Sequence, residues 1–199
     1  MKKLKIILFI ILVVVLGGIC ALRFFGPSDV VVLTEEQEAK YKQDQVNQFK
    51  NINLTGFKTK DLNGKEITSD IFSKYKVTMV NIWSTWCGPC IEEMPEIGKL
   101  YEDLPEGANI ISICTDAGES EKTLSLAKEI MEKSNANFTT LIPDEFLKTN
   151  LTDDIQTLPT TIFIDSEGKV IGEPHFDGQT AEAYRNSINE RLKMIEENQ

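Results

Sequence analysis

Hydrophobic and polar residues are distributed along this chain in a way that separates three regions. Residues 6–22 carry no charged side chain, a mostly polar stretch follows, and apolar runs then return at intervals up to the carboxyl end. The later runs have the length of buried strands and are separated by stretches with helical spacing. The pattern predicts an amino-terminal apolar segment over residues 1–26, a polar and partly helical spacer over 27–51, and a folded domain over 52–199.

Two apolar runs in the domain predict the central strands of a sheet. Residues 77–83 and 109–116 are nearly continuous in apolar and β-branched residues, as strands covered on both faces are. Apolar residues at helical spacing follow each run, over residues 91–104 and 120–133. Strand and helix therefore alternate, which predicts an α/β domain in three layers.

Shorter elements are predicted at both ends of the domain. Asn63-Gly64 indicates a hairpin over residues 57–67 with a two-residue turn. Near the carboxyl end, a strand after Pro159 and a return strand at 170–172 precede a closing helix over residues 180–195.

The charge of the chain is asymmetric and limits the choice of partners. The 199 residues include 21 Lys and Arg and 31 Asp and Glu, for a net charge of −10. Residues 1–26 hold four of the basic residues and no acidic one, so the remainder has a net charge of −14. A surface this acidic argues against nucleic acid or anionic lipid as a partner.

The amino terminus has the pattern of a membrane anchor. A basic head of three lysines precedes residues 6–22, which reach the lower end of the length that a spanning helix needs. The basic flank predicts that the amino terminus stays in the cytoplasm and that the chain after Arg23 is exported. A cleaved signal peptide and lipid attachment at Cys20 are the alternatives. All three place the domain outside the cytoplasmic membrane.

A pair of cysteines lies between the first central strand and the helix after it. The segment Trp86-Cys87-Gly88-Pro89-Cys90 places the two thiols one helical turn apart. A helix that begins near Cys87 points free N–H groups and the positive end of its dipole at that sulfur, which favours the thiolate. Pro89 costs little there, because first-turn N–H groups have no partner within the helix. The pattern predicts a redox-active dithiol.

A zinc site and a structural disulfide are the alternatives for this pair. A zinc site usually needs a second C-x-x-C or a pair of histidines, whereas Cys20, Cys114 and His175 lie at scattered spacing. A disulfide between near neighbours restrains the unfolded chain little. Cys114 is predicted to pack as a small apolar residue in its strand, and His175 is predicted to be structural. No metal or cofactor is expected.

The cysteine motif resembles that of the thioredoxin family, and the fuller pattern resembles its membrane-anchored TlpA/ResA-like branch. The second motif that carries the likeness is the segment 157–160, Thr-Leu-Pro-Thr. The resemblance implies a thioredoxin-like fold with a central mixed sheet, an extra amino-terminal β-hairpin, and a cis peptide bond before Pro159 in a loop that faces the cysteines. The backbone of Leu158 would then be free to pair with an extended substrate. The other residues expected at this substrate surface are Trp86, Gly88, Pro89 and Pro159.

Two polar positions near the cysteines carry a further prediction. Asn81 stands six residues before Cys87, where thioredoxins have a buried aspartate that moves protons for the resolving cysteine. Glu93, three residues after Cys90, matches an acidic active-site residue of the ResA-like branch. Burial beside thiols raises the pKa of a carboxyl group, and its ionised form disfavours a neighbouring thiolate. Glu93 is expected to accept and return the proton of Cys90; the alternative is a solvated glutamate.

The resemblance implies a thiol–disulfide oxidoreductase tethered outside the cytoplasmic membrane. Cys87 would attack a substrate disulfide and Cys90 would resolve the mixed disulfide. The Gly88-Pro89 pair resembles the reducing members, so disulfide reduction in exported proteins is expected, with a CcdA-type membrane electron donor. Apocytochrome c thiols are the best-known targets of the family, which suggests cytochrome c maturation. Two alternatives stay open: a peroxiredoxin-like peroxidase, although Ser84 stands where peroxiredoxins have threonine, and a non-catalytic redox-responsive binding module.

Overall fold

The computed structural model of the protein describes residues 34–197, and the chain divides into two units, 1–42 and 43–199. Helix α2 (Glu35–Phe49) is the first described element. It begins with a capping box: the backbone N of Gln37 donates to Thr34 Oγ1 at 3.3 Å, and the backbone N of Thr34 donates to Gln37 Oε1 at 2.9 Å. The predicted anchor lies outside the described residues, and within residues 34–197 no helix is long and apolar enough to cross a membrane.

The end of α2 packs against the folded domain. Phe49 is buried, belongs to the same apolar cluster as Leu54 and Phe57, and lies 6.0 Å from the ring of Phe176. The sequence predicts a polar spacer over residues 27–51 and a domain that starts at residue 52. Phe49 lies within that spacer and still belongs to the core, where a buried aromatic ring contributes substantial apolar area.

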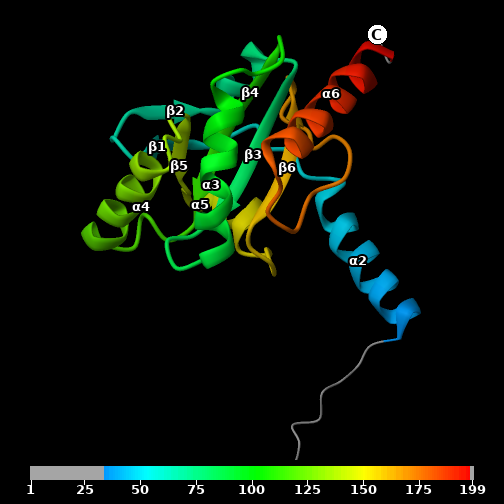
Figure 1. Ribbon diagram of the computed structural model, residues 1–199, viewed down its shortest axis with the longest axis horizontal. Helices are drawn as coiled ribbons and strands as arrows, with labels where there is room; N and C mark the ends of the chain where they lie inside the picture. Colours follow the sequence, from blue (N-terminus) through cyan, green and yellow to red (C-terminus); the bar gives the residue numbers. More distant parts are fainter. Residues whose placement is uncertain (1–33, 198–199) are drawn as a thin grey trace, which may run out of the picture. The chain divides into compact units, whose positions relative to one another are not determined.

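The second unit is built on a six-stranded mixed sheet (Figure 1). The strand order is β2-β1-β5-β4-β3-β6; β3 pairs in parallel with β4, and β4 with β5, while the other pairings are antiparallel. β3 and β4 are buried along their whole length, as their nearly continuous apolar runs predict. The strands are β1 (Lys58–Asp61), β2 (Glu66–Thr68), β3 (Val77–Trp83), β4 (Ala108–Cys114), β5 (Thr139–Ile142) and β6 (Thr160–Asp165).

Helices cover both faces of the sheet and complete the three predicted layers (Figure 1). Alternate residues of β3 belong to different apolar clusters: Met79 packs with residues of α3, α4 and α6, whereas Val80 packs with Phe72 and Leu147 on the other face. The α-helices are α3 (Gly88–Tyr101), α4 (Glu121–Lys133), α5 (Glu145–Leu147) and α6 (Ala181–Glu197); η1 (Ser69–Lys74) is a 3₁₀-helix and η2 (Lys148–Thr152) a π-helix.

The hairpin β1–β2 lies where the sequence predicts one, but its turn is longer. Lys60 pairs with Glu66, and the backbone N of Asp61 donates to the carbonyl of Lys65 at 2.9 Å. The loop therefore contains the three residues 62–64, with Gly64 at φ +84°. This is the three-residue hairpin loop with glycine in the left-handed region, and the predicted two-residue Asn-Gly turn was wrong.

The predicted return strand at 170–172 does not form. Val170 makes an isolated bridge to Ile164 in β6, and no strand includes it in the described chain. Gly172 has φ +69°, which ends the extended conformation two residues after the bridge.

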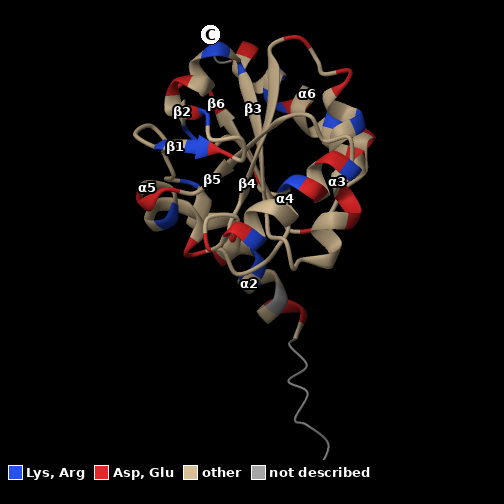
Figure 2. Ribbon diagram, turned by 90° about the vertical axis from the view of Figure 1, so that its left-hand side faces the viewer, with Lys and Arg blue, Asp and Glu red and all other residues tan. Residues whose placement is uncertain are grey.

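Acidic and basic residues are interspersed along the ribbon of the domain, α3 included (Figure 2). Some form ion pairs, such as Lys76 with Glu196 at 3.1 Å and Lys133 with Glu129 at 2.5 Å. All four side chains are more than half exposed, so these pairs contribute little to stability. The two apolar clusters on the sheet hold the domain together.

We expect Gly98→Ala to destabilise the domain, because α3 passes close to the end of α4 at this residue. A Cβ atom on Gly98 would lie 2.8 Å from the carbonyl oxygen of Ser134 and 3.0 Å from that of Asn135. Overpacking of this kind costs about 1–3 kcal/mol, which exceeds the gain in helix propensity. Urea denaturation of the full chain measures the effect. Gly88→Ala is the control, since its Cβ would meet nothing within 4 Å; equal losses in both variants would contradict the steric explanation.

Candidate active site

The two cysteines lie where strand β3 is followed by helix α3, as predicted. Cys87 is the N-cap of α3, with extended backbone angles, and its Sγ atom accepts a hydrogen bond from the backbone N of Cys90 at 3.3 Å. The two residues form a disulfide. Cys87 is 5% exposed and Cys90 is fully buried. The N–H group of Cys90 and the positive end of the α3 dipole therefore face the sulfur of Cys87, where they would stabilise a thiolate after reduction.

A buried aspartate holds the loop that leads into the cysteine motif. Asp116 accepts hydrogen bonds from the backbone N of Thr85 at 3.0 Å, from the Thr85 hydroxyl, and from the Cys114 thiol at 3.3 Å. The sequence analysis missed this role. The available signal was that Asp116 follows β4, whose carboxyl end lies beside that of its parallel neighbour β3.

A groove of about 640 Å³ opens beside the disulfide. Trp86 is 73% exposed at this groove, an unusual position for a large aromatic side chain and one suited to contact with another molecule. Of the predicted substrate residues, Trp86, Gly88, Pro89 and Leu158 line the groove and Pro159 does not. The other lining residues are Cys87, Thr115, Thr152, Ile155, Gln156 and Thr157. Segments far apart in the sequence thus meet at the cysteines.

The peptide bond between Leu158 and Pro159 is cis, as the resemblance implies. Pro159 is buried immediately before β6, and Leu158 is half-buried at the groove. The loop before β6 therefore lies on the same groove as Cys87 and Gly88, which is the arrangement expected for a substrate-binding loop.

Glu93 lies one turn after Cys90 on α3, with its side chain buried at 5% exposure. Asn81 Nδ2 donates to its Oε1 at 2.8 Å, and the Tyr184 hydroxyl and the Gln179 backbone N donate to its Oε2 at 2.8 and 3.3 Å. The alternative of a solvated glutamate is therefore wrong. Tyr184 was missed, because it lies 91 residues away in the chain and no local pattern points to it.

The surroundings of Glu93 act on its pKa in opposite directions. Burial raises the pKa of the carboxyl group, and the hydrogen bonds from Tyr184, Asn81 and Gln179 lower it, with the net result that the pKa stays above its usual value. Tyr184 has its own pKa raised, first by burial and then by the charge of Glu93. The phenol therefore stays protonated and remains a donor where a carboxyl group titrates.

Two further residues have the contacts of packing residues. The backbone N and O atoms of His175 bond to Thr161 at 2.8 Å each, and its Nε2 lies 2.9 Å from Ser187 Oγ. Burial, followed by the nearby charge of Arg191, lowers the pKa of His175. Cys114 is fully buried, and burial raises its pKa far above that of a free thiol, so this thiol is unreactive.

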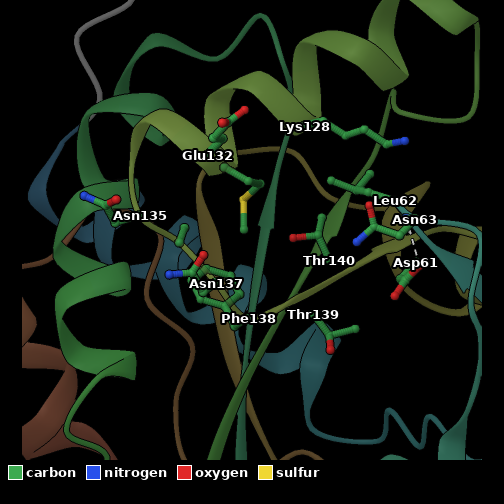
Figure 3. A pocket seen from close by; sticks show the side chains of 12 residues that line it. Asp61, Leu62, Asn63, Lys128, Glu132, Asn135, Asn137, Phe138, Thr139 and Thr140 are labelled. Carbon is green, nitrogen blue, oxygen red and sulfur yellow. Dashed lines mark hydrogen bonds between the residues drawn. The ribbon is translucent and has the colours of Figure 1, made fainter.

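A second cavity, of about 590 Å³, lies between β1, β5 and α4 (Figure 3). Polar side chains dominate its lining, among them Asp61, Lys128, Glu132 and Asn137. None of the predicted site residues lines it. The chemistry of this protein is therefore assigned to the groove at the cysteines.

Residues 47–172 match the AhpC/TSA family. Two similar curated proteins are each named thiol-disulfide oxidoreductase ResA. That of Bacillus thuringiensis subsp. konkukian is 29% identical over 198 residues, which cover 98% of this chain and 99% of the relative. That of Bacillus subtilis is 33% identical over 117 residues, which cover 58% of this chain and 61% of the relative.

Solved structures share the fold. A DsbF homologue from Corynebacterium diphtheriae has a TM-score of 0.58 at 16% identity, over 69% of this chain and 85% of that one. StoA from Bacillus subtilis has a TM-score of 0.53 at 21% identity, over 65% of this chain and 93% of that one. Likeness at such identities concerns the fold alone.

Proposed function

The chain belongs to the AhpC/TSA family, has a thioredoxin-like fold and is a thiol–disulfide oxidoreductase, and we propose that it reduces disulfides in exported proteins. The observation that carries this proposal is the position of Cys87 as the N-cap of α3, at the edge of a groove and paired with buried Cys90. This geometry supports a role for Cys87 in the attack on substrate and for Cys90 in the resolution of the mixed disulfide.

The reaction follows from the two sulfur positions. In the reduced protein, the Cys87 thiolate attacks one sulfur of a substrate disulfide; a mixed disulfide forms, and the other substrate sulfur leaves and takes a proton. Cys90 then loses its proton and attacks the Cys87 sulfur. This step forms the Cys87–Cys90 disulfide and releases the second substrate thiol. Two electrons have passed from the dithiol to the substrate.

Glu93 is proposed as the group that takes the proton of Cys90. It lies three residues after Cys90 on α3, and both side chains are buried. Burial brings the pKa of this carboxyl group closer to that of a thiol than the pKa of a solvated carboxyl group would be. Proton transfer between Glu93 and Cys90 then costs less free energy in either direction.

The reducing direction is supported by the residues between the cysteines. Gly88-Pro89 places no basic side chain beside the sulfurs, so the helix terminus is the main local source of thiolate stabilisation. Regeneration of the dithiol then needs two electrons from a partner. We propose a membrane electron donor of the CcdA type, which would draw on reductant in the cytoplasm.

The proposed place of work is the outer side of the cytoplasmic membrane. Support comes from the uncharged stretch 6–22 behind a basic head. Cytochrome c maturation is the corresponding proposal for the physiological role, with apocytochrome c thiols among the substrates.

The reduction potential of the Cys87/Cys90 pair tests the direction. We expect a value nearer to about −270 mV, that of thioredoxin, than to about −120 mV, that of DsbA. Equilibration of the full chain with glutathione or dithiothreitol buffers, followed by thiol counting, gives the potential. A value near that of DsbA would reverse the proposed direction. Insulin reduction and hydrogen peroxide consumption, measured on the same sample, separate the reductase from a peroxidase; efficient peroxide turnover would favour the peroxidase.

A further inference from the structure

Four side chains from four elements form a closed ring of hydrogen bonds, and the Glu93 carboxylate is one of its members. Asn81 of β3 donates from Nδ2 to Glu93 Oε1 at 2.8 Å and to Thr161 Oγ1 of β6 at 3.1 Å. The Tyr184 hydroxyl of α6 lies 3.1 Å from Thr161 Oγ1 and donates to Glu93 Oε2 at 2.8 Å. All four residues are buried.

The donors in this ring are directed toward Glu93. Both N–H groups of the Asn81 amide are used, so Thr161 Oγ1 accepts from Asn81 and has its own hydrogen left for the Tyr184 oxygen. Tyr184 accepts that hydrogen and gives its own to Glu93. The ring therefore ends in two side-chain donors on one carboxylate, an arrangement that stabilises the ionised form.

We propose that Tyr184 is a positioning residue that fixes the Glu93 carboxylate and sets the pH at which it exchanges a proton with Cys90. The inference rests on the proposed function, in which Glu93 carries that proton. Tyr184 is not among the described residues that line the groove, so it acts through Glu93 and does not contact the substrate.

Of the groups that face Glu93, Tyr184 is the one suited to this task. β3 and β6 contribute the neutral Asn81 and Thr161, and the segment before α6 contributes a backbone N–H from Gln179. A further titratable group on the α6 side is His175, whose ring lies 6.0 Å from that of Tyr184. Asp177 precedes Gly178, at which a Cβ atom would lie 3.2 Å from Glu93 Oε2. On α3 itself, Glu96 accepts from the backbone N of Ala181 at 2.9 Å, and Cys90 precedes Glu93 by one turn.

Removal of the phenol oxygen of Tyr184 should change the pKa of Glu93 in a defined direction. A hydrogen bond to the ionised carboxylate lowers its pKa, so the Tyr184→Phe variant should raise the pKa of Glu93. For the loss of one charge-assisted bond we expect an upward shift of about one pH unit. The phenylalanine ring keeps the apolar contacts of Tyr184, so packing in the core is preserved.

The shift can be measured on Glu93 itself. In the oxidised full chain Cys87 and Cys90 do not titrate, so the side-chain carboxyl carbon of Glu93, followed by NMR in protein labelled with ¹³C-glutamate, reports Glu93 without coupling to these two thiols. The signal is identified by its loss in Glu93→Gln. Tyr101→Phe is the matched control, because the Tyr101 ring packs on Phe138 at 5.6 Å and lies outside the ring around Glu93.

The pH profile of insulin reduction is the second readout. We expect the Tyr184→Phe profile to move upward together with the Glu93 midpoint, while the Tyr101→Phe profile stays with that of the wild type. Thr161→Val removes the donor to the Tyr184 oxygen and should shift both readouts in the same direction by less. If circular dichroism shows that Tyr184→Phe does not fold, Thr161→Val is used in its place for both measurements.

Two results would overturn the inference about Tyr184, and a third would contradict the proposed role of Glu93 on which it rests. An unchanged Glu93 midpoint in both Tyr184→Phe and Thr161→Val overturns it directly. A profile that changes in Glu93→Gln but not in Tyr184→Phe overturns it while the role of Glu93 stands. If Glu93→Gln also keeps the wild-type profile, the proposed proton transfer by Glu93 is wrong, and the role of Tyr184 falls with it.

Discussion

The Cys87→Ser variant is expected to lose disulfide reduction completely, down to the uncatalysed rate. The attacking species is a thiolate at the amino terminus of α3, and a serine hydroxyl neither ionises at neutral pH nor forms a disulfide. The variant should fold, because serine is itself a favoured N-cap residue and can accept the hydrogen bond that Cys87 receives from the backbone N of Cys90. Insulin reduction by the full chain with a small dithiol as electron source measures the loss.

Cys90→Ser and Cys114→Ser complete this experiment. Cys90→Ser keeps the attacking sulfur but cannot resolve the mixed disulfide, so a covalent adduct with the substrate should accumulate on a non-reducing gel. Cys114→Ser should keep wild-type activity, because the buried Cys114 thiol bonds to Asp116 and serine can make the same bond. Reduction by Cys87→Ser at more than the uncatalysed rate, or an adduct formed by Cys114→Ser, would show that the wrong sulfur has been assigned.

The central part of the fold could be predicted because burial leaves a local signature. β3 and β4 are enclosed on both faces, and their sequences are apolar at almost every position. The start of α3 is likewise local, since the cap, the proline in the first turn and the second cysteine lie within four residues. Elements that are stabilised by interactions within a few residues can therefore be predicted from the sequence.

The turn after β1 shows where local preference gives way. Asn-Gly favours a two-residue turn, but Asp61 Oδ1 accepts from the backbone N atoms of Asn63 and Lys65 at 2.8 and 2.9 Å. These two bonds fit the three-residue loop. The hydrogen bonds of the Asp61 side chain compete with the turn preference of Asn-Gly, and that preference alone does not predict them.

The candidate site was predictable only for its cysteine half. Trp86 to Cys90 form one continuous motif, and Glu93 follows at a fixed helical spacing. The partners that determine how Glu93 titrates come from three other elements: Asn81, Thr161 and Tyr184. Their meeting depends on the order of the strands and on the placement of α6 over the sheet, which are properties of the whole fold.

The residues proposed for sulfur chemistry and for proton transfer have different surroundings. Cys87 lines the groove, the proposed place of substrate binding, while Glu93 is enclosed by β3, β6 and α6. Solvent screens a buried carboxyl group little, so the groups around it act strongly on its pKa. Substitution of Glu93 should therefore alter the pH dependence more than the binding of substrate.

Glu93→Gln is expected to slow disulfide reduction at neutral pH by roughly 10²-fold, the lower range for loss of a general base. Above its raised pKa, Glu93 is ionised and can accept the proton of Cys90; below it, the group is neutral and cannot. The wild-type rate should fall on the acid side of that pKa, and this limb should disappear in Glu93→Gln. Glu92→Gln is the matched control, because Glu92 is exposed on the same helix. Identical pH profiles for the wild type and both variants would remove Glu93 from the mechanism.

The same variant should gain stability as it loses activity, which separates a role in chemistry from a role in folding. Because burial raises the folded-state pKa of Glu93 above its unfolded value, ionisation of this group costs folding free energy as the pH rises through that window. Glutamine carries no charge, so the cost disappears. Its amide can be accommodated by reorientation of Asn81, whose Oδ1 has no hydrogen-bond partner in the described part of the chain. Urea denaturation at acid and neutral pH should show Glu93→Gln at least as stable as the wild type at neutral pH. A less stable variant there would mean that the carboxylate is retained for folding.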